Sequence, residues 1–323
     1  MMRLGILSTA HINRLVIPGL QVSPETQLLA VASRDEGRAK QYAEQWSIPR
    51  AYGSYEALLD DPEIECVYVS LPNALHLDWS VRALRAGKHV LCEKPLGRDP
   101  GSVAHAFDVA AENGKLLMEG FMWRFHPQTT QLQLLVEELA PLQGIDAKFG
   151  FNLANPADVR LSKELGGGAL MDVGCYCVSA SRLLAGEPEV AVGRQVIGSD
   201  GVDVHFTGTL TFPGGLEADL ECGLDMESAD ALEVDCEAGS IFLDDPWHGR
   251  EPVIVVTTPL ERREMRGPAI DAYQAEVENL SRAARGVEPP FLGREDAVGQ
   301  ARTIEALYRS AEGGSEPVQI PKD

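Results

Sequence analysis

The sequence lacks long hydrophobic runs, paired-cysteine motifs and any excess of positive charge. No stretch of its 323 residues reaches the roughly 20 apolar residues that a membrane-spanning helix needs. The N-terminus runs from Met1 directly into an apolar strand, with no charged-then-apolar leader and cleavage site. We therefore expect a cytoplasmic protein with no membrane partner.

The charge balance is strongly acidic, with a formal net charge of -21. Such a field repels nucleic acid and anionic membrane surfaces, so we expect neither as a partner. The Asp and Glu residues are scattered and form no long acidic tail. The acidity therefore indicates solubility or adaptation to salt, and it does not point to a function.

The six cysteines form no CxxC pair and have no histidine at zinc-finger spacing. Cys175 and Cys177 form a CxC pair, which raises the alternative of a metal site. Buried, reduced thiols in a cytoplasmic enzyme are the favoured interpretation. We therefore predict no metal site.

The length predicts two domains, and 44% hydrophobic residues are enough for sizeable cores. In the first part, short apolar strands without alternation are separated by amphipathic helices, which is typical of parallel strands covered on both faces. The predicted strands are 4–7, 28–33, 66–70, 89–92 and 116–119, and the predicted helices include 36–46, 77–86 and 100–113. We predict an α/β fold with an N-terminal Rossmann domain, a doubly wound parallel sheet, over residues 1–121.

From residue 122 to 323 the pattern changes to strands joined by hairpin turns such as Pro213-Gly214-Gly215. This pattern predicts a C-terminal α+β domain with a large, mostly antiparallel open sheet. The expected strands are 147–153, 191–197, 204–212, 216–223, 232–236, 241–243 and, last, 253–257. The expected helices are 130–138, 169–184, 270–285 and 295–310.

The turn after the first strand is the expected place for a dinucleotide pyrophosphate, because backbone N–H groups and a helix N-terminus meet there. The usual GxGxxG is absent. Its place is taken by small and hydroxyl-bearing residues, in the run Ser8, Thr9, Ala10, His11 and Ile12. By itself this run is equally consistent with an ordinary helix cap at Ser8 or Thr9.

The end of the second strand strengthens the nucleotide interpretation. Ser33 and Arg34 stand where an acidic residue would bind the adenosine ribose of NAD. A small hydroxyl followed by Arg suits the 2′-phosphate of NADP, since Arg offers a planar fork of donors. Arg38 would assist. NADP is therefore the expected cofactor. The neighbouring Asp35 could still bind the ribose of NAD. The alternative for Arg34 is that it is only a solvated loop residue.

Two further runs follow strands at the same predicted edge, where ligands bind in doubly wound sheets. One is Leu71-Pro72-Asn73 with His76, and the other contains Glu93 and Lys94 before a proline. A lone Lys after a strand is usually a surface charge. Placed between an acid and a proline at this edge, Lys94 is more consistent with a functional role.

In the second domain Asp172 and Tyr176 are four residues apart on a predicted helix and so share one face. A triple glycine before them would let backbone approach a ligand closely. A buried core role for Tyr176 is the alternative. Trp123 and Arg124, with the nearby His126, follow the fifth strand and are candidates for lining a site.

Together these runs resemble the glucose-fructose oxidoreductase / inositol dehydrogenase / rhizopine-catabolism (Gfo/Idh/MocA) family. The branch they resemble contains NADP-dependent D-xylose dehydrogenases and dimeric dihydrodiol dehydrogenases. The resembling runs are GILSTAHI, AVASRD, AYGSYEALL, LPNALH, AGKHVLCEKPL, MEGFMWRFHPQ and GGGALMDVGCYCV, in order from residue 5 to 178. Many family members have His at the position of Tyr176. The Tyr found here resembles the residue of the sugar and diol branch.

The resemblance implies catalytic roles for Lys94 and Tyr176. It implies an oxidoreductase acting on a sugar or diol, and a homo-oligomer, dimer or tetramer, formed through the C-terminal sheet. The residues expected to bind the cofactor are Ser8, Thr9, Ala10, His11, Ile12, Ser33, Arg34, Arg38, Leu71, Pro72, Asn73, His76, Glu93, Lys94 and Arg124. The residues expected to bind substrate are Lys94, Trp123, Asp172 and Tyr176.

In this interpretation Tyr176 accepts a proton from a substrate hydroxyl, as hydride passes to nicotinamide. A free Tyr has a pKa near ~10, so a neighbouring Lys94 would favour the phenolate and polarise the substrate oxygen. An aldose such as D-xylose would give a lactone. Two alternatives stay open: a non-catalytic dinucleotide sensor of the same fold, and an oxidoreductase whose NADP never leaves.

Overall fold

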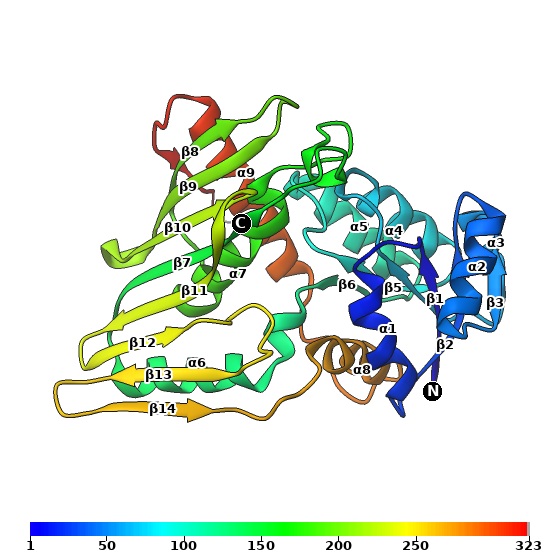
Figure 1. The fold of residues 1–323 in the computed structure, drawn as a ribbon, viewed down its shortest axis with the longest axis horizontal. Coiled ribbons are helices and arrows are strands. Elements are labelled where there is room, and N and C mark those ends of the chain that lie inside the picture. The colour runs from blue at the N-terminus through cyan, green and yellow to red at the C-terminus, as the bar shows by residue number, and fades with distance from the viewer. Residues whose placement is uncertain (322–323) are drawn as a thin grey trace. The chain divides into compact units, whose positions relative to one another are not determined.

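A computed structural model describes residues 1–321. They form two compact units, the first made of residues 1–122 with 273–298 and the second of residues 123–272 with the chain from 299 onward (Figure 1). The predicted boundary after residue 121 placed 273–298 in the second domain. The structure groups this segment, which contains helix α8 (Ala272–Ala284), with the first unit.

The first unit contains the predicted doubly wound sheet. Its six strands are parallel and lie in the order β3-β2-β1-β4-β5-β6. The strands are β1 (Met2–Leu7), β2 (Thr26–Ala32), β3 (Arg50–Tyr52), β4 (Cys66–Val69), β5 (His89–Glu93) and β6 (Leu117–Gly120). The helices are α1 (Asn13–Val22), α2 (Glu36–Trp46), α3 (Tyr55–Leu59), α4 (His76–Arg85) and α5 (Pro100–Glu112).

The central strands are apolar because both faces of the sheet are covered. All residues of β4 are buried, as are those of β6. Side chains of Asp35, Ser54 and Asp99 accept the first free backbone N–H groups of α2, α3 and α5. These caps fix where each helix begins beside its strand.

The second unit contains a nine-stranded sheet in the order β14-β13-β12-β11-β7-β10-β9-β8-β15. Every neighbouring pair is antiparallel except β7 with β10. The strands are β7 (Leu142–Asn152), β8 (Val190–Ile197), β9 (Asp203–Thr211), β10 (Glu217–Gly223), β11 (Asp225–Cys236), β12 (Gly239–Leu243), β13 (Val253–Thr257), β14 (Arg262–Arg266) and β15 (Val318–Gln319). The expected fold class, a mostly antiparallel open sheet, is confirmed.

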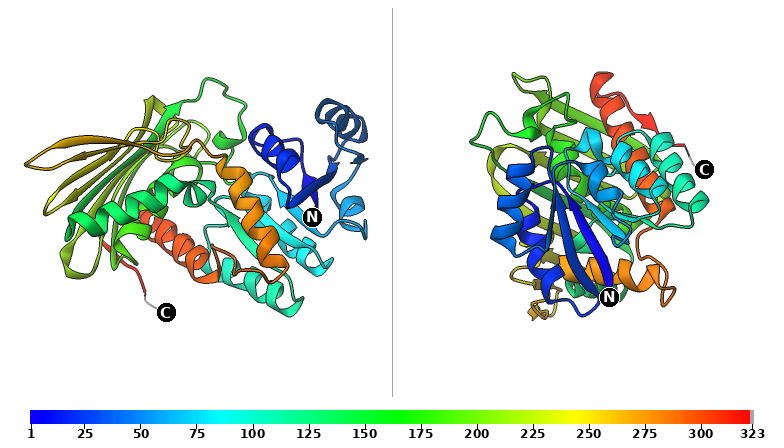
Figure 2. Two further views of the ribbon diagram at one scale, coloured as in Figure 1. Left: turned by 90° about the horizontal axis from the view of Figure 1, so that it is seen from below. Right: turned by 90° about the vertical axis from the view of Figure 1, so that its right-hand side faces the viewer.

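Helices lie along one face of this sheet. They are α6 (Pro127–Leu139), α7 (Cys175–Ala185) and α9 (Arg294–Glu312) (Figure 2). Strand residues alternate between buried and more exposed, as in β10. One face of the sheet is thus the core of the unit, and the other is its open face.

Three structural elements of the second unit differ from expectation, and one of them is the short strand β15, which pairs with β8. The predicted last strand, β13, is followed by β14, whose RREMR sequence forms an edge strand by backbone pairing. The predicted helix 169–184 consists of a π-helical segment, η4 (Leu170–Gly174), followed by α7.

The six cysteines are all buried and free. Burial raises the pKa of the Cys66 thiol to about 12, and it also raises the pKa of Cys177 and Cys222. They are protonated, inert core residues rather than reactive thiols.

Within residues 1–321, none of the helices is both long and apolar enough to cross a membrane.

Candidate active site

The β1–α1 turn of the first unit has glycine-like geometry without glycine. Ser8 takes a φ of 116°, in a region that favours glycine. Its hydroxyl donates to the carbonyl of Ser70 at 2.8 Å and accepts the N–H of Ala10 at 3.1 Å. Asn13 donates to the Ser8 carbonyl at 3.0 Å. These contacts hold the turn in a conformation that a GxGxxG run would otherwise require.

Neither Ser8 nor Thr9 acts as an ordinary cap of α1. The N-cap position is Ile12, and no side chain bonds the first turn there. His11 is exposed, and Thr9, Ala10 and Ile12 are half-buried in the turn. The first N–H groups of α1 instead bond backbone carbonyls of the turn, from Asn13 to Ala10, Arg14 to His11 and Leu15 to Ile12. The turn thus winds directly into the positive end of the α1 dipole beside small side chains, which suits a dinucleotide phosphate.

The end of β2 presents two exposed arginines. Arg34 and Arg38 are both exposed, and both lie close enough to Tyr55 to oppose the rise in its pKa that burial causes. The buried Ser33 hydroxyl accepts the N–H of Asp35 at 3.3 Å. The Asp35 carboxylate accepts the N–H of Arg38 at 2.7 Å as the N-cap of α2. The Asp35 carboxylate thus already caps α2, and the two exposed guanidinium groups offer donors that suit a 2′-phosphate.

His76 connects the two runs that follow β4 and β5. It is 1% exposed, and its ring nitrogens lie 2.9 Å from the Pro95 carbonyl oxygen and 2.7 Å from that of Leu71. Burial lowers its pKa, and the positive charge of Lys94 lowers it further. Both ring nitrogens face backbone carbonyls, and a neutral ring donates to one of them. His76 thus ties the run after β4 to the Lys94-Pro95 backbone, and the cofactor contact expected from sequence stays a prediction.

The residues around Lys94 include buried carboxylates. Glu93, the last residue of β5, is 8% exposed and accepts a short hydrogen bond from the Tyr68 hydroxyl. Glu119 of β6 is 2% exposed and accepts the N–H of Leu96 at 2.6 Å. The backbone on both sides of Lys94 is therefore fixed to neighbouring strands. Leu71, Pro72 and Asn73 follow β4 at the same edge.

In the second unit, Asp172 lies in η4 and Tyr176 in the first turn of α7. π-Helical turns are rare and are found frequently at functional sites. The N-terminus of η4 is held by Asp203 of β9, which accepts the N–H of Leu170 at 2.7 Å and the Tyr308 hydroxyl at 2.8 Å. Asp203 thus fixes the start of the segment that contains both predicted residues.

The triple glycine before this segment is needed for contacts within the chain. A Cβ at Gly167 would collide with the carbonyl of Arg160, and one at Gly168, whose φ is +130°, would collide with the Asp203 carboxylate. These glycines therefore have a packing role within the chain, and close approach of this backbone to a ligand stays a prediction.

Tyr176 is 5% exposed and lies in a cluster of aromatic side chains. Its ring centroid is 5.3 Å from that of Phe149 and 5.9 Å from that of Trp247, and Trp247 is 5.7 Å from Trp123. Apolar aromatic surfaces of this kind suit the C–H faces of sugars and rings. The structure thus brings together Tyr176 and Trp123, and adds Phe149 and Trp247, which the sequence did not mark.

Asp172 is paired with a residue that the sequence did not mark either. Arg160 Nε lies 2.7 Å from an Asp172 carboxylate oxygen. Arg124, expected to bind cofactor, belongs to the second unit and lies 5.8 Å from the ring centroid of Trp123. His126 is 2% exposed and caps α6 through the N–H of Gln128; the expectation that it lines a site stays a prediction.

These features are those of a dinucleotide-dependent oxidoreductase. Comparison with known families places the chain in that class. Residues 2–121 match the Gfo/Idh/MocA oxidoreductase family with an NAD-binding Rossmann fold. Residues 136–242 match the Gfo/Idh/MocA C-terminal domain. The chain is therefore a member of the Gfo/Idh/MocA family, as the resemblance implied.

Particular relatives resemble it over more than three quarters of its length. It is 41% identical to D-xylose 1-dehydrogenase (NADP(+)) 2 of Haloferax volcanii, over 97% of this chain and 98% of that protein. It is 35% identical to a trans-1,2-dihydrobenzene-1,2-diol dehydrogenase of Sus scrofa, over 78% and 77%. A 3-ketoreductase from Actinomadura kijaniata, solved with NADP and TDP-benzene, has 32% identity and a TM-score of 0.90, with 95% and 97% covered.

Asp203 predicts a distinct dependence of stability on pH. Burial raises its pKa from 3.8 to about 6. This shift corresponds to a contribution of about 3 kcal/mol to the free energy of unfolding when the carboxyl is protonated. Because the folded state binds the proton more tightly, this contribution is present below pH ~4 and is lost as the pH rises through about 6. We expect the free energy of unfolding of the wild type, relative to Asp203→Asn, to fall by about that amount over this window.

The measurement is urea unfolding of both proteins at a series of pH values. Asp219→Asn, an exposed side chain of β10, is the matched control and should follow the wild type. A difference between wild type and Asp203→Asn that does not vary with pH would contradict the assignment.

Proposed function

We propose that this protein is an NADP-dependent oxidoreductase that transfers hydride between nicotinamide and a CH–OH group of a sugar or a related polyol or diol. An aldose such as D-xylose, oxidised to its lactone, is the proposed substrate type. The observation that carries the proposal is 41% identity, over 97% of the chain, to a D-xylose 1-dehydrogenase. The presence of Lys94 and Tyr176 in their expected elements supports it.

NADP supplies the hydride acceptor when it is bound. The turn at Ser8 to Ile12 would hold the pyrophosphate, and Arg34 with Arg38 would hold the 2′-phosphate. Lys94 would polarise the substrate oxygen, and Tyr176 would take the hydroxyl proton. Asp172, oriented by Arg160, would accept a hydrogen bond from a second hydroxyl. In the reductive direction Tyr176 would return the proton.

The roles of Lys94 and Tyr176 predict a loss of turnover that leaves nucleotide binding in place. Lys94→Met and Tyr176→Phe should each lower kcat by roughly 100-fold or more. The first removes the group that polarises the substrate oxygen, and the second removes the group that accepts its proton. The assay follows reduced nicotinamide over pentoses, hexoses and diols. Lys40→Met, an exposed lysine of α2, is the control. Wild-type turnover in both variants would show that the assignment is wrong.

The wild-type protein also tests the sensor alternative. A protein that binds NADPH but transfers hydride to none of the sugars, diols or carbonyls would contradict the enzymatic proposal. Fluorescence of bound NADPH, measured beside turnover, separates these two outcomes.

The exposed arginines predict the cofactor preference. Arg34→Gln should lower kcat/KM for NADP by about 10-fold or more and leave that for NAD nearly unchanged, since it removes a charge-assisted contact to the 2′-phosphate only. Arg85→Gln, an exposed arginine at the end of α4, is the control. Equal losses with both cofactors would contradict this role.

A second candidate function is sugar-to-sugar hydride exchange with retained NADP. It is favoured by similarity to an aldose-aldose oxidoreductase from Caulobacter crescentus, with 28% identity, a TM-score of 0.91 and 98% of this chain covered. Nucleotide that copurifies with the protein and survives dialysis would favour this candidate. Free exchange of NADP during turnover would exclude it.

We also propose a cytoplasmic homo-oligomer. The buried, free cysteines support a reducing compartment. The open face of the nine-stranded sheet supports association, because a second copy can cover it. A sedimentation mass equal to the 35.0 kDa of one chain would contradict the oligomer.

A further inference from the structure

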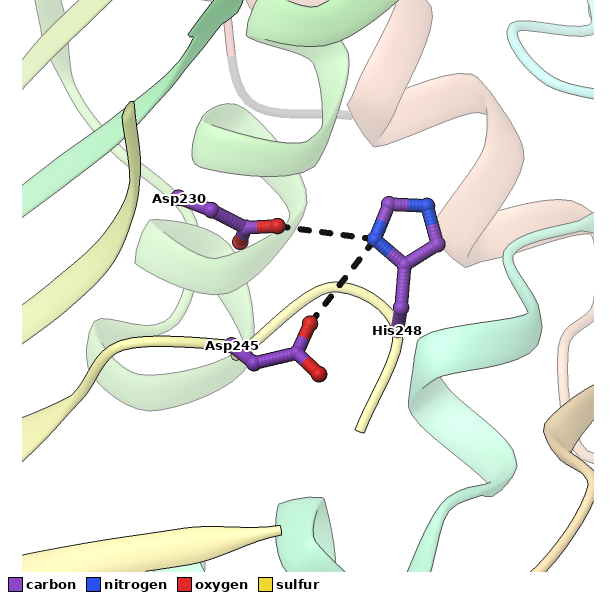
Figure 3. A group of neighbouring side chains, drawn as sticks. All are labelled: Asp230, Asp245 and His248. Carbon is purple, nitrogen blue, oxygen red and sulfur yellow. Dashed lines mark ion pairs between the residues drawn. The ribbon is translucent and has the colours of Figure 1, made fainter. Parts of the chain in front are cut away.

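Asp230, Asp245 and His248 form a compact cluster in the second unit. Asp230 lies in β11, and the other two lie in the connection between β12 and β13. Both carboxylates point toward Nδ1 of His248, at 3.5 Å from Asp230 Oδ2 and 3.9 Å from Asp245 Oδ1 (Figure 3). One donor atom from each residue can be chosen so that all lie within 4.8 Å of one another.

This donor set suits a transition-metal cation. Zinc binds imidazole nitrogen and carboxylate oxygen at about 2.0–2.2 Å, which places tetrahedral ligands about 3.4 Å apart. The two carboxylates lie 3.5 and 3.9 Å from the imidazole nitrogen, and the whole set lies within 4.8 Å, so binding would require the side chains to draw together. Mg²⁺ and Ca²⁺ prefer oxygen ligands alone, and the imidazole therefore favours zinc and similar metals.

The cluster contains buried polar atoms that lack hydrogen bonds. Oδ1 of Asp230, Oδ1 of Asp245 and Nδ1 of His248 are solvent-inaccessible and have no partner with hydrogen-bond geometry. The other oxygen of Asp245 accepts the N–H groups of Arg250 at 2.5 Å and Glu251 at 3.1 Å. Buried polar atoms are nearly always satisfied, and an ion is one of the agents that satisfies them.

Two further buried side chains beside Asp245 are also unsatisfied. Gln128 is 3% exposed; its Nε2 donates to the Asp245 carbonyl at 3.0 Å, and its Oε1 has no hydrogen-bond partner. His126 is 2% exposed, its ring lies beside Gly249 of the same connection, and its Nε2 has no hydrogen-bond partner. Unsatisfied polar atoms thus surround the same connection, which fits a hydrated cation better than direct protein contacts.

The electrostatics point the same way. The side chains of Asp230 and Asp245 are only 22% and 14% exposed, and both carboxylates face the same nitrogen of His248. Two carboxylates and one imidazole leave a net negative charge in a partly buried place. A divalent cation would relieve both the repulsion and the desolvation.

We propose that Asp230, Asp245 and His248 bind one divalent transition-metal cation of the zinc type, with water completing the coordination. The cation would link β11 to the β12–β13 connection. That connection contains Trp247, whose ring lies 5.9 Å from the ring of Tyr176. The site would therefore stabilise the aromatic cluster beside Tyr176, and it has no part in hydride transfer.

The test is zinc binding by the full-length chain after treatment with a chelator. Calorimetric titration of the wild type with ZnCl₂ should show one site per chain. Asp230→Asn and Asp245→Asn should each weaken binding by on the order of 100-fold, since each removes a ligand. Asp225→Asn is the matched control, because Asp225 also lies in β11 beside a histidine, 3.4 Å from His205, but outside the cluster. It should bind zinc as the wild type does.

Thermal unfolding gives a second readout that does not depend on activity. Saturating zinc should raise Tm by roughly 5 °C in the wild type and in Asp225→Asn, and not in the two cluster variants. Without metal, Asp230→Asn should unfold no earlier than the wild type, because it removes a buried like charge. Absence of zinc binding in the wild type, equal binding by the cluster variants, or equal stabilisation by Mg²⁺ would overturn the proposal.

Discussion

The carboxyl edge of the six-stranded sheet is held together by buried hydrogen bonds that join neighbouring strand ends. Ser8 after β1 bonds the Ser70 carbonyl after β4, and His76 joins the runs after β4 and β5. Glu119 of β6 accepts the backbone N–H of Leu96. Each bond satisfies a buried polar group. Leaving such a group without a partner would cost about 1–3 kcal/mol of folding free energy. The backbone that presents Lys94 and the nucleotide turn is therefore fixed before any ligand arrives.

A comparable constraint operates in the second unit. The buried Asp203 holds the N-terminus of η4, and the glycines before η4 exist so that Arg160 and Asp203 can approach the backbone. Tyr176 is then fixed by aromatic neighbours. In both units the candidate catalytic residue is carried by backbone that other side chains position, which is the arrangement expected for a preorganised site.

The fold was predictable because the apolar composition of its main strands indicates where they lie. Unalternating runs such as Cys66–Val69 indicate strands covered on both faces, and the structure has them there. β14 was missed because an edge strand needs only backbone pairing, and RREMR has no apolar pattern. The π-helical turn was missed because it depends on Asp203, which is 31 residues away in sequence from Asp172.

The candidate site was predictable only in part. Motif residues such as Lys94 and Tyr176 follow recognisable runs, but nothing in the sequence indicates that both ring nitrogens of His76 face backbone carbonyl oxygens. Phe149, Arg160 and Trp247 lie in segments without a motif. Their contribution depends on which strands and loops become neighbours, and periodicity does not specify that. The His248 cluster likewise joins residues from β11 and a later connection.

The central claim is that this chain moves hydride between a carbon-bound hydroxyl and NADP. The most direct measurement uses the best sugar or diol substrate with deuterium on the carbon that bears the reacting hydroxyl, followed by mass spectrometry of the reduced cofactor. The account predicts that the deuterium is recovered in NADPH, because hydride passes without exchange with water. Product formed together with unlabelled NADPH, with the deuterium released to water, would contradict it.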